Sequence, residues 1–125
     1  MRHPLLLAAT AAIATLFATS PADAAMSVGA FLAKAAPLRA NPLLALMSPD
    51  YPTLKAEADD ATRQLKADRA ARAAAGKPPI ACVPPGQSLG IMDMLAGLDA
   101  LPAADKKRPL KDGYARVLQQ RFPCR

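Results

Sequence analysis

The chain has 125 residues, with 16 Lys and Arg against 10 Asp and Glu, and a formal net charge of +6 at pH 7. This length predicts one small domain with a modest core and excludes a large multidomain protein. The basic charge favours an acidic protein surface or an anionic envelope component as partner, or it serves only to keep a small domain in solution.

Residues 1–24 have the pattern of a secretory signal peptide. Arg2 carries a positive charge, residues 5–17 are apolar, and Ala22-Asp23-Ala24 offers small residues to a signal peptidase. The alternative is a membrane anchor, but the apolar run is shorter than the ~20 residues that cross a bilayer. We therefore expect cleavage after Ala24, a mature domain of residues 25–125 without a membrane span, and a periplasmic location.

The first half of the mature chain predicts two helices joined by a short apolar turn. Ser27 is a good N-cap for a helix to about Ala40, in which Pro37 predicts a kink or an early stop. The apolar turn 43–47 is expected to pack against this helix.

A third helix, roughly 52–75, has an apolar stripe that gives way to Arg69 and Arg72. We expect its first half to be buried and its second half to be a solvated charged face. Gly76 and the Pro78-Pro79 pair are expected to end it. The stripe consists of Leu54, Ala58, Ala61 and Leu65.

Two further helices are predicted in the last third of the chain. Ser88 is the expected N-cap of a helix running to about Ala100, and Pro109 opens a last helix that Phe122-Pro123 ends. Apolar residues at helical spacing predict the buried faces: Ile91, Met94, Leu95 and Leu98 in the first, and Leu110, Tyr114, Val117 and Leu118 in the second.

If these two helices run antiparallel, Cys82 and Cys124, the only cysteines, lie at neighbouring ends. Export favours a disulfide between them. A zinc site needs four ligands, and the only histidine, His3, leaves with the signal peptide; a redox pair is usually closely spaced. The fold class expected is thus all-α: a small bundle of about four helices, with one disulfide closing a C-terminal helical hairpin.

Groups for catalysis are scarce, so we expect no enzyme, no cofactor and no metal. Without a mature histidine, no Ser-His or Cys-His nucleophile can form. Asp59 and Asp60 are adjacent on an exposed helix, and no glycine-rich phosphate loop is present. Export also makes nucleic acid an unexpected partner.

The C-terminal third resembles a known family. The residues that carry the resemblance are Cys82-x-Pro84-x-Gly86-x-Ser88, a helix, Pro102, Arg108-Pro109, a second helix and Phe122-Pro123-Cys124. This framework, over residues 82–124, resembles the Rap/Tai family of immunity proteins. Members are small exported helical proteins that neutralise peptidoglycan amidase effectors of type VI secretion. The resemblance implies an amidase effector as partner, occlusion as mechanism, and a homodimer.

Two surfaces are candidates for these contacts. The connector between the last two helices is polar and lies opposite the disulfide, so Asp105, Lys106, Lys107 and Arg108 are the candidate effector contact; the alternative is an ordinary solvated turn. The turn 43–47 is the candidate pairing surface of a homodimer. The competing functions are an acid-response periplasmic chaperone and a structural envelope protein.

Overall fold

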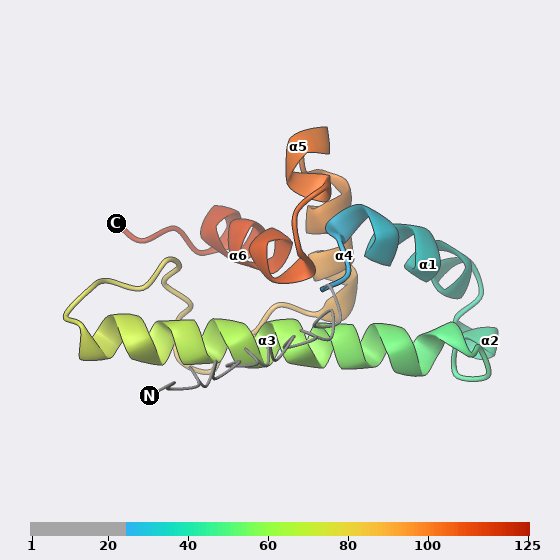
Figure 1. Ribbon diagram of the computed structural model, residues 1–125, viewed down its shortest axis with the longest axis horizontal. Helices are drawn as coiled ribbons and strands as arrows, with labels where there is room; N and C mark the ends of the chain where they lie inside the picture. Colours follow the sequence, from blue (N-terminus) through green and yellow to red (C-terminus); the bar gives the residue numbers. More distant parts are fainter. Residues whose placement is uncertain (1–24) are drawn as a thin grey trace, which may run out of the picture.

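One helix of 25 residues, α3, runs the length of the molecule, and the other helices pack along one side of it (Figure 1). The structure is a computed structural model that describes residues 25–125. Within them it has no β-strand, which confirms the all-α prediction, and two of its six helices are single turns of four residues. The helices are α1 (Val28–Ala40), α2 (Pro42–Ala45), α3 (Asp50–Ala74), α4 (Ile91–Asp99), α5 (Ala103–Lys106) and α6 (Leu110–Arg121).

Helix α1 begins where the sequence predicts. The hydroxyl of Ser27 accepts a hydrogen bond from the backbone N–H of Ala30 at 3.1 Å, as an N-cap does. Of the two outcomes expected at Pro37, a kink or an early stop, the early stop is wrong, since the helix continues to Ala40. Proline removes a single N–H donor here, in the last turn, and its carbonyl still accepts from the N–H of Asn41 at 3.2 Å.

Helix α3 follows the predicted division into a buried and a solvated half. Leu54 and Ala61 are buried, whereas side chains in the second half are mostly exposed. The helix ends at Ala74, and Gly76 follows at a φ of +69°, a conformation that glycine adopts without strain. The N–H of Lys77 donates to the carbonyl of Arg72 at 2.8 Å and the N–H of Gly76 to that of Ala73 at 3.1 Å, the two bonds of a Schellman motif.

The core lies where α1, α4 and α6 meet over α3, and close backbone approach compensates for its few aromatic side chains. A Cβ at Gly97 would lie 2.6 Å from Cγ1 of Val117, and one at Gly113 would overlap Val28 and Leu98. Glycine at these two positions therefore lets the helices come together tightly. The fully buried side chains are Leu98, Leu110, Val28 and Val117.

Helix α4 differs from the prediction at its start. It begins at Ile91 rather than after Ser88, with Gly90 at the N-cap and no side-chain capping bond. Ile91 was expected in the buried stripe but is 57% exposed, because the first turn of α4 projects beyond the core. Met94, Leu95 and Leu98 are buried as predicted.

The connector between α4 and α6 is part of the fold. It contains α5, and it pairs with the chain before α1: the N–H of Val28 donates to the carbonyl of Arg108 at 3.0 Å, and the N–H of Leu110 donates to the carbonyl of Met26 at 2.9 Å. An antiparallel bridge between Ser27 and Pro109 results. This bridge anchors the start of the described chain to the hairpin.

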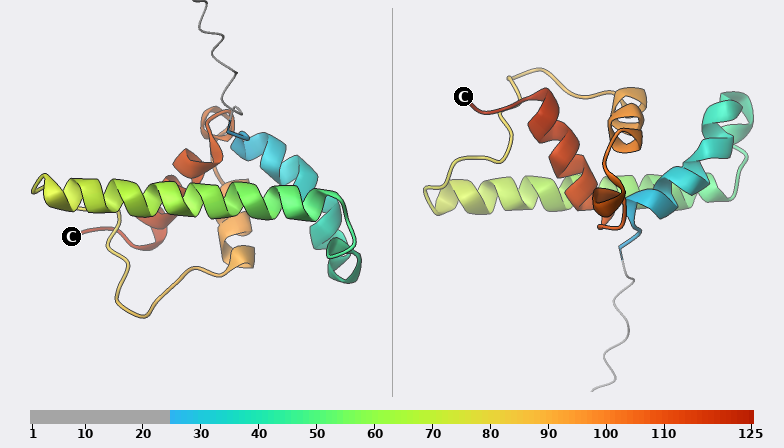
Figure 2. Two further views of the ribbon diagram at one scale, coloured as in Figure 1. Left: turned by 60° about the horizontal axis from the view of Figure 1, so that its bottom comes forward. Right: turned by 90° about the horizontal axis from the view of Figure 1, so that it is seen from above.

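The predicted disulfide between Cys82 and Cys124 is present, with a Cα–Cα distance of 4.9 Å. Beside it the N–H of Cys82 donates to the carbonyl of Phe122 at 2.8 Å. After α3 the chain therefore returns to the end of α6 before it crosses to α4, as Figure 2 shows. The segment 83–90 separates the disulfide from α4, so the closed loop is wider than a simple helical hairpin.

We expect Cys82→Ser to destabilise the protein by about 4 kcal/mol, because the bond closes a loop with a sequence separation of 42 residues. Urea unfolding of wild type and variant, with and without reductant, measures the loss. Reductant should bring the wild type to the stability of the variant and leave the variant unchanged. Equal midpoints for oxidised wild type and variant would contradict a structural role.

Candidate functional site

An open groove of about 680 Å³ lies between the second half of α3 and the segment 79–89. Its floor is formed by Leu65 of α3, Met94 of α4, and Tyr114 and Leu118 of α6. The segment 79–89 adds an apolar wall of Ile80, Ala81, Val83 and Leu89. Pockets of this size, largely apolar with a few polar groups, are typical of small-molecule sites.

The first part of the wall formed by the segment 79–89 is held at two points. Its start is fixed by the side chain of Arg72, whose Nε donates to the carbonyl of Pro78 at 2.7 Å. Two residues into the wall, Ala81 is buried, and the disulfide at Cys82 follows. The groove is thus a built feature of the fold, with one wall from a helix and one from a tethered strand-like segment.

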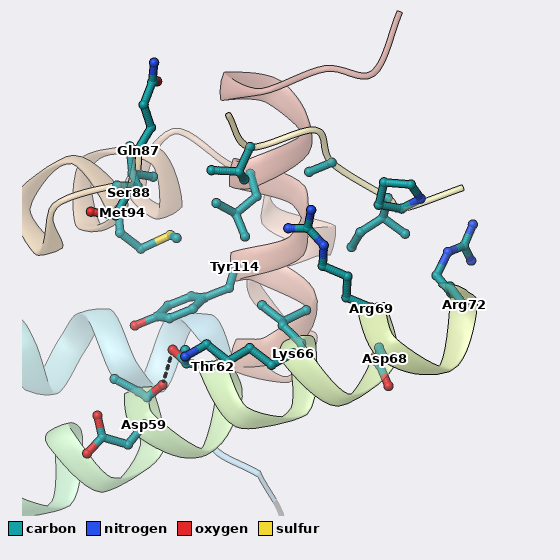
Figure 3. Close-up of a pocket in the computed structure, with 18 of the residues that line it drawn as sticks. Asp59, Thr62, Lys66, Asp68, Arg69, Arg72, Gln87, Ser88, Met94 and Tyr114 are labelled. Atoms are coloured by element: carbon teal, nitrogen blue, oxygen red, sulfur yellow. Dashed lines mark hydrogen bonds between the residues drawn. The ribbon is translucent and has the colours of Figure 1, made fainter. Parts of the chain in front are cut away.

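Three cations line the α3 side of this groove at intervals of three residues: Lys66, Arg69 and Arg72. Figure 3 shows the side chain of Arg69 directed from α3 toward the groove, and that of Lys66 lying back along the helix toward Thr62. Residues three apart are neighbours on a helix surface, and like charges there repel one another. The groove wall is therefore positively charged.

The carboxylates of α3 that border the groove are engaged elsewhere. Asp68 points away from the groove and pairs with Lys111 at 2.5 Å, while Asp59 pairs with Lys55 at 2.6 Å. Within residues 25–125, neither Lys66 nor Arg69 has a carboxylate within ion-pair distance. These two cations are therefore available to an anion from outside.

Tyr114 is the most distinctive polar group of the groove. Its side chain is only 6% exposed, and its hydroxyl lies at the groove floor without a hydrogen bond to any described residue (Figure 3). Burial, and secondarily the charge of Asp59, raise the pKa of Tyr114 above its ordinary value of 10.0. The phenol is thus a neutral donor throughout the physiological pH range.

A second, smaller groove of about 370 Å³ adjoins the first. It lies among α1, α3 and α4, and it shares Ala58, Asp59 and Ile91 with the larger groove. The exposed side chain of Ile91 therefore stands at the junction of the two. The lining of the smaller groove is also mainly apolar and includes Phe31, Leu38, Leu54, Met92 and Leu95.

The turn 43–47 was expected to pack against the first helix; its backbone does lie beside α1, but its large side chains are exposed rather than buried there. Leu43 is 88% exposed and Met47 is 82% exposed, and α2 contributes no buried residue. The reason is its length: α2 is a single turn after Pro42, at the end of the molecule where α1 connects to α3 (Figure 1). Its apolar side chains extend into solvent, with Leu44 and Leu46 also exposed.

The four connector residues are brought together but differ in their contacts. Asp105 lies 3.9 Å from Arg116, and Arg108 lies 3.4 Å from Asp112, both in ion pairs with α6. Lys106 is half-buried, and Lys107 is exposed. The two lysines are therefore the members of this set that remain free to bind a partner, since neither is in an ion pair with a described residue.

The groove is the feature that sequence reasoning missed. Lys66 and Arg69 of α3 are exposed as predicted, whereas Arg72 is half-buried against Pro78, and the chain opposite them was interpreted only as a linker. The available signal was the set of apolar residues spaced among the prolines of 78–85, since a solvated linker has no need of Ile80, Ala81 and Val83.

Comparisons of the chain with protein-family models, with curated proteins and with solved structures found no match. Among residues 25–125, no group of three or more His, Cys, Asp or Glu side chains is placed to hold a metal ion. In the same part of the chain, no helix is both long enough and apolar enough to cross a membrane. The signal-peptide prediction concerns residues 1–24, which lie outside the described residues.

The raised pKa of Tyr114 predicts a loss of stability at high pH. In the unfolded chain Tyr114 releases its phenolic proton near pH 10, whereas in the folded chain it does so only at higher pH. Ionisation therefore favours the unfolded chain, and the free energy of unfolding should fall as pH rises above about 10. In Tyr51→Phe, Tyr114 is the sole tyrosine, and its phenolate absorbance should have a midpoint above pH 10. A midpoint at or below 10 would contradict the burial argument.

Proposed function

We propose that this chain is an exported, non-catalytic immunity-type protein that binds and occludes a cell-wall amidase effector. The observation that carries the proposal is the ordered connector, where Lys106 and Lys107 form no ion pair with a described residue. The four large exposed side chains of residues 43–47 form a separate apolar surface of the kind that marks protein-interaction sites, and we assign it to pairing between two copies of the chain. Resemblance of residues 82–124 to the Rap/Tai framework supplies the class of partner.

The construction of the domain supports binding by a preformed surface. The disulfide and the bridge between Ser27 and Pro109 fix the C-terminal hairpin on α1, and α5 stands at the end of that hairpin away from Cys82 (Figure 1). A segment that is already ordered loses little conformational entropy when it enters an enzyme cleft. The connector, with Lys106 and Lys107, is our candidate for the inserted element.

Periplasmic location is part of the proposal. A disulfide is favoured in an oxidising compartment, and the sequence pattern of residues 1–24 is that of a cleaved signal peptide. The cell-wall substrate of an amidase lies in the same compartment, where an inhibitor would meet the enzyme.

An acid-response chaperone is less well supported. Such a protein opens when buried carboxylates are neutralised at low pH, but the described chain buries no polar or charged side chain. Its apolar surface at 43–47 is exposed without any titration. A structural envelope protein remains the other alternative, and it predicts no protection against an amidase.

The effector contact can be tested with a double variant, Lys106→Ala with Lys107→Ala. We expect it to lower the association rate with the candidate effector encoded by the neighbouring gene about tenfold at low salt, because rim charges act mainly on the encounter rate. Stopped-flow binding over a salt series measures this rate, and the wild-type rate should fall as salt rises. Coexpression in the periplasm measures protection.

The matched control is Lys77→Ala with Arg125→Ala, which removes the same net charge from exposed residues outside the connector. This control should protect cells as wild type does. Equal slowing by both double variants would assign the effect to net charge and refute the connector as the contact. Failure of wild type to protect, together with suppression of protein aggregation at acid pH, would replace the proposal by the chaperone alternative.

Residues 43–47 are proposed as the pairing surface of a homodimer. Leu43→Ser with Met47→Ser should convert a dimer to a monomer in sedimentation equilibrium while leaving helicity unchanged, since both side chains are exposed in the single chain. A wild-type protein that sediments as a monomer at concentrations of about 100 µM, well above ordinary dimer dissociation constants, would refute this pairing.

A further inference from the structure

The groove along α3 combines features that an inhibitor surface does not require. It is elongated, since the residues of α3 that line it extend from Ala58 to Arg72, roughly 21 Å at the rise of an α-helix. Its floor and far wall are apolar, and it stays open to solvent although it lies beside the core. Filling it with an apolar chain would remove that surface from water, at about 25 cal/mol per Å².

Two cations of the groove, Lys66 and Arg69, suit an anion, while the bordering carboxylates Asp59 and Asp68 are paired with Lys55 and Lys111. Lys66 and Arg69 repel each other across one helical turn, and no described carboxylate pairs with either of them. A carboxylate beside Arg69 would gain charge-assisted hydrogen bonds from its guanidinium, and the flexible side chain of Lys66, which lies back along α3 toward Thr62, would have to turn to reach the same carboxylate. Arg72 is committed in part to Pro78, so Lys66 and Arg69 are the two principal anchors.

Tyr114 supplies the groove with a hydrogen-bond donor. The residue is 6% exposed, and its hydroxyl faces the groove without a hydrogen bond to any described residue. Because no side-chain oxygen of the described residues is both buried and unpartnered, this hydroxyl is open to the solvent of the groove, where a ligand oxygen would replace water as its acceptor. Asp59, the nearest acid, is held by Lys55 and does not compete for the phenol.

From this combination we infer that the groove binds a single-chain anionic amphiphile, a long-chain fatty acid, with its acyl chain along the apolar floor and its carboxylate held by Lys66 and Arg69, with Tyr114 as hydrogen-bond donor. This activity goes beyond the proposed immunity function and does not depend on it. A partner helix with acidic residues is the competing occupant, and the test below distinguishes the two.

The test measures binding of cis-parinarate, a fluorescent fatty acid, and its displacement by competitors. Palmitate should displace it, hexadecanol should do so at least tenfold more weakly because it lacks the charge, and acetate should not displace it. The double change Lys66→Gln with Arg69→Gln should weaken palmitate about tenfold or more and leave hexadecanol unchanged. Tyr114→Phe, which preserves the ring, should weaken palmitate severalfold.

Matched controls keep the result specific. Arg63→Gln removes a cation of α3 that pairs with Asp60 and does not line the groove, and it should bind as wild type does. Ala71→Phe narrows the groove and should reduce the affinity of palmitate and hexadecanol alike, whereas Ala70→Phe, next to it but outside the groove, should not. Circular dichroism establishes that each variant is folded.

Several results would overturn the inference. Equal affinity for palmitate and hexadecanol would leave no role for the cations. Loss of binding in Arg63→Gln equal to that in the double variant would place the effect outside the groove. Displacement of parinarate by an acidic amphipathic peptide but not by palmitate would assign the groove to a protein partner.

Discussion

The tether at Cys82 and Cys124 is the constraint on which the rest of the structure depends. It brings the chain that follows α3 back to the end of α6, where the N–H of Cys82 bonds to the carbonyl of Phe122. Without that tether, residues 79–89 would have few contacts to hold them, because only Ala81 among them is buried. The same disulfide thus stabilises the domain and holds the segment that forms the second wall of the groove. The fold and the groove therefore both depend on it.

The core shows how a chain with few aromatic residues reaches a high packing density. Gly97 and Gly113 remove side chains where α4 and α6 cross their neighbours, and Val117, Val28 and Leu98 fill the space. Close backbone approach gives good dispersion contact per residue but buries little area in total. Apolar surface is consequently left over, in the grooves beside α3 and at residues 43–47, where it is available to partners.

Sequence patterns predicted the helices and the disulfide better than they predicted which side chains are exposed and where the groove lies. Helical spacing located α1, α3 and α6 to within about two residues, and the cysteine argument located the disulfide, because both depend on local or covalent chemistry. Ile91 was misassigned because its spacing matches Met94 and Leu98, while its exposure depends on where α4 leaves the core. The groove escaped notice for the same reason: its walls come from segments far apart in sequence, and periodicity within one helix carries no information about the other wall.

The two proposed activities use different parts of the molecule. The connector lies on the α1 side of the hairpin, tied to Met26 and Val28, whereas the groove lies between α3 and the tethered segment 79–89. The connector carries Lys106 and Lys107 on the short segment between α4 and α6, whereas the groove carries Lys66 and Arg69 along one wall. A cationic turn suits insertion into an enzyme cleft, and an apolar groove with a cationic edge suits an amphiphile. The Cys82–Cys124 disulfide holds the wall of the groove but not the bridge at Ser27 and Pro109. Reduction of the disulfide should therefore loosen the groove before it disturbs the connector.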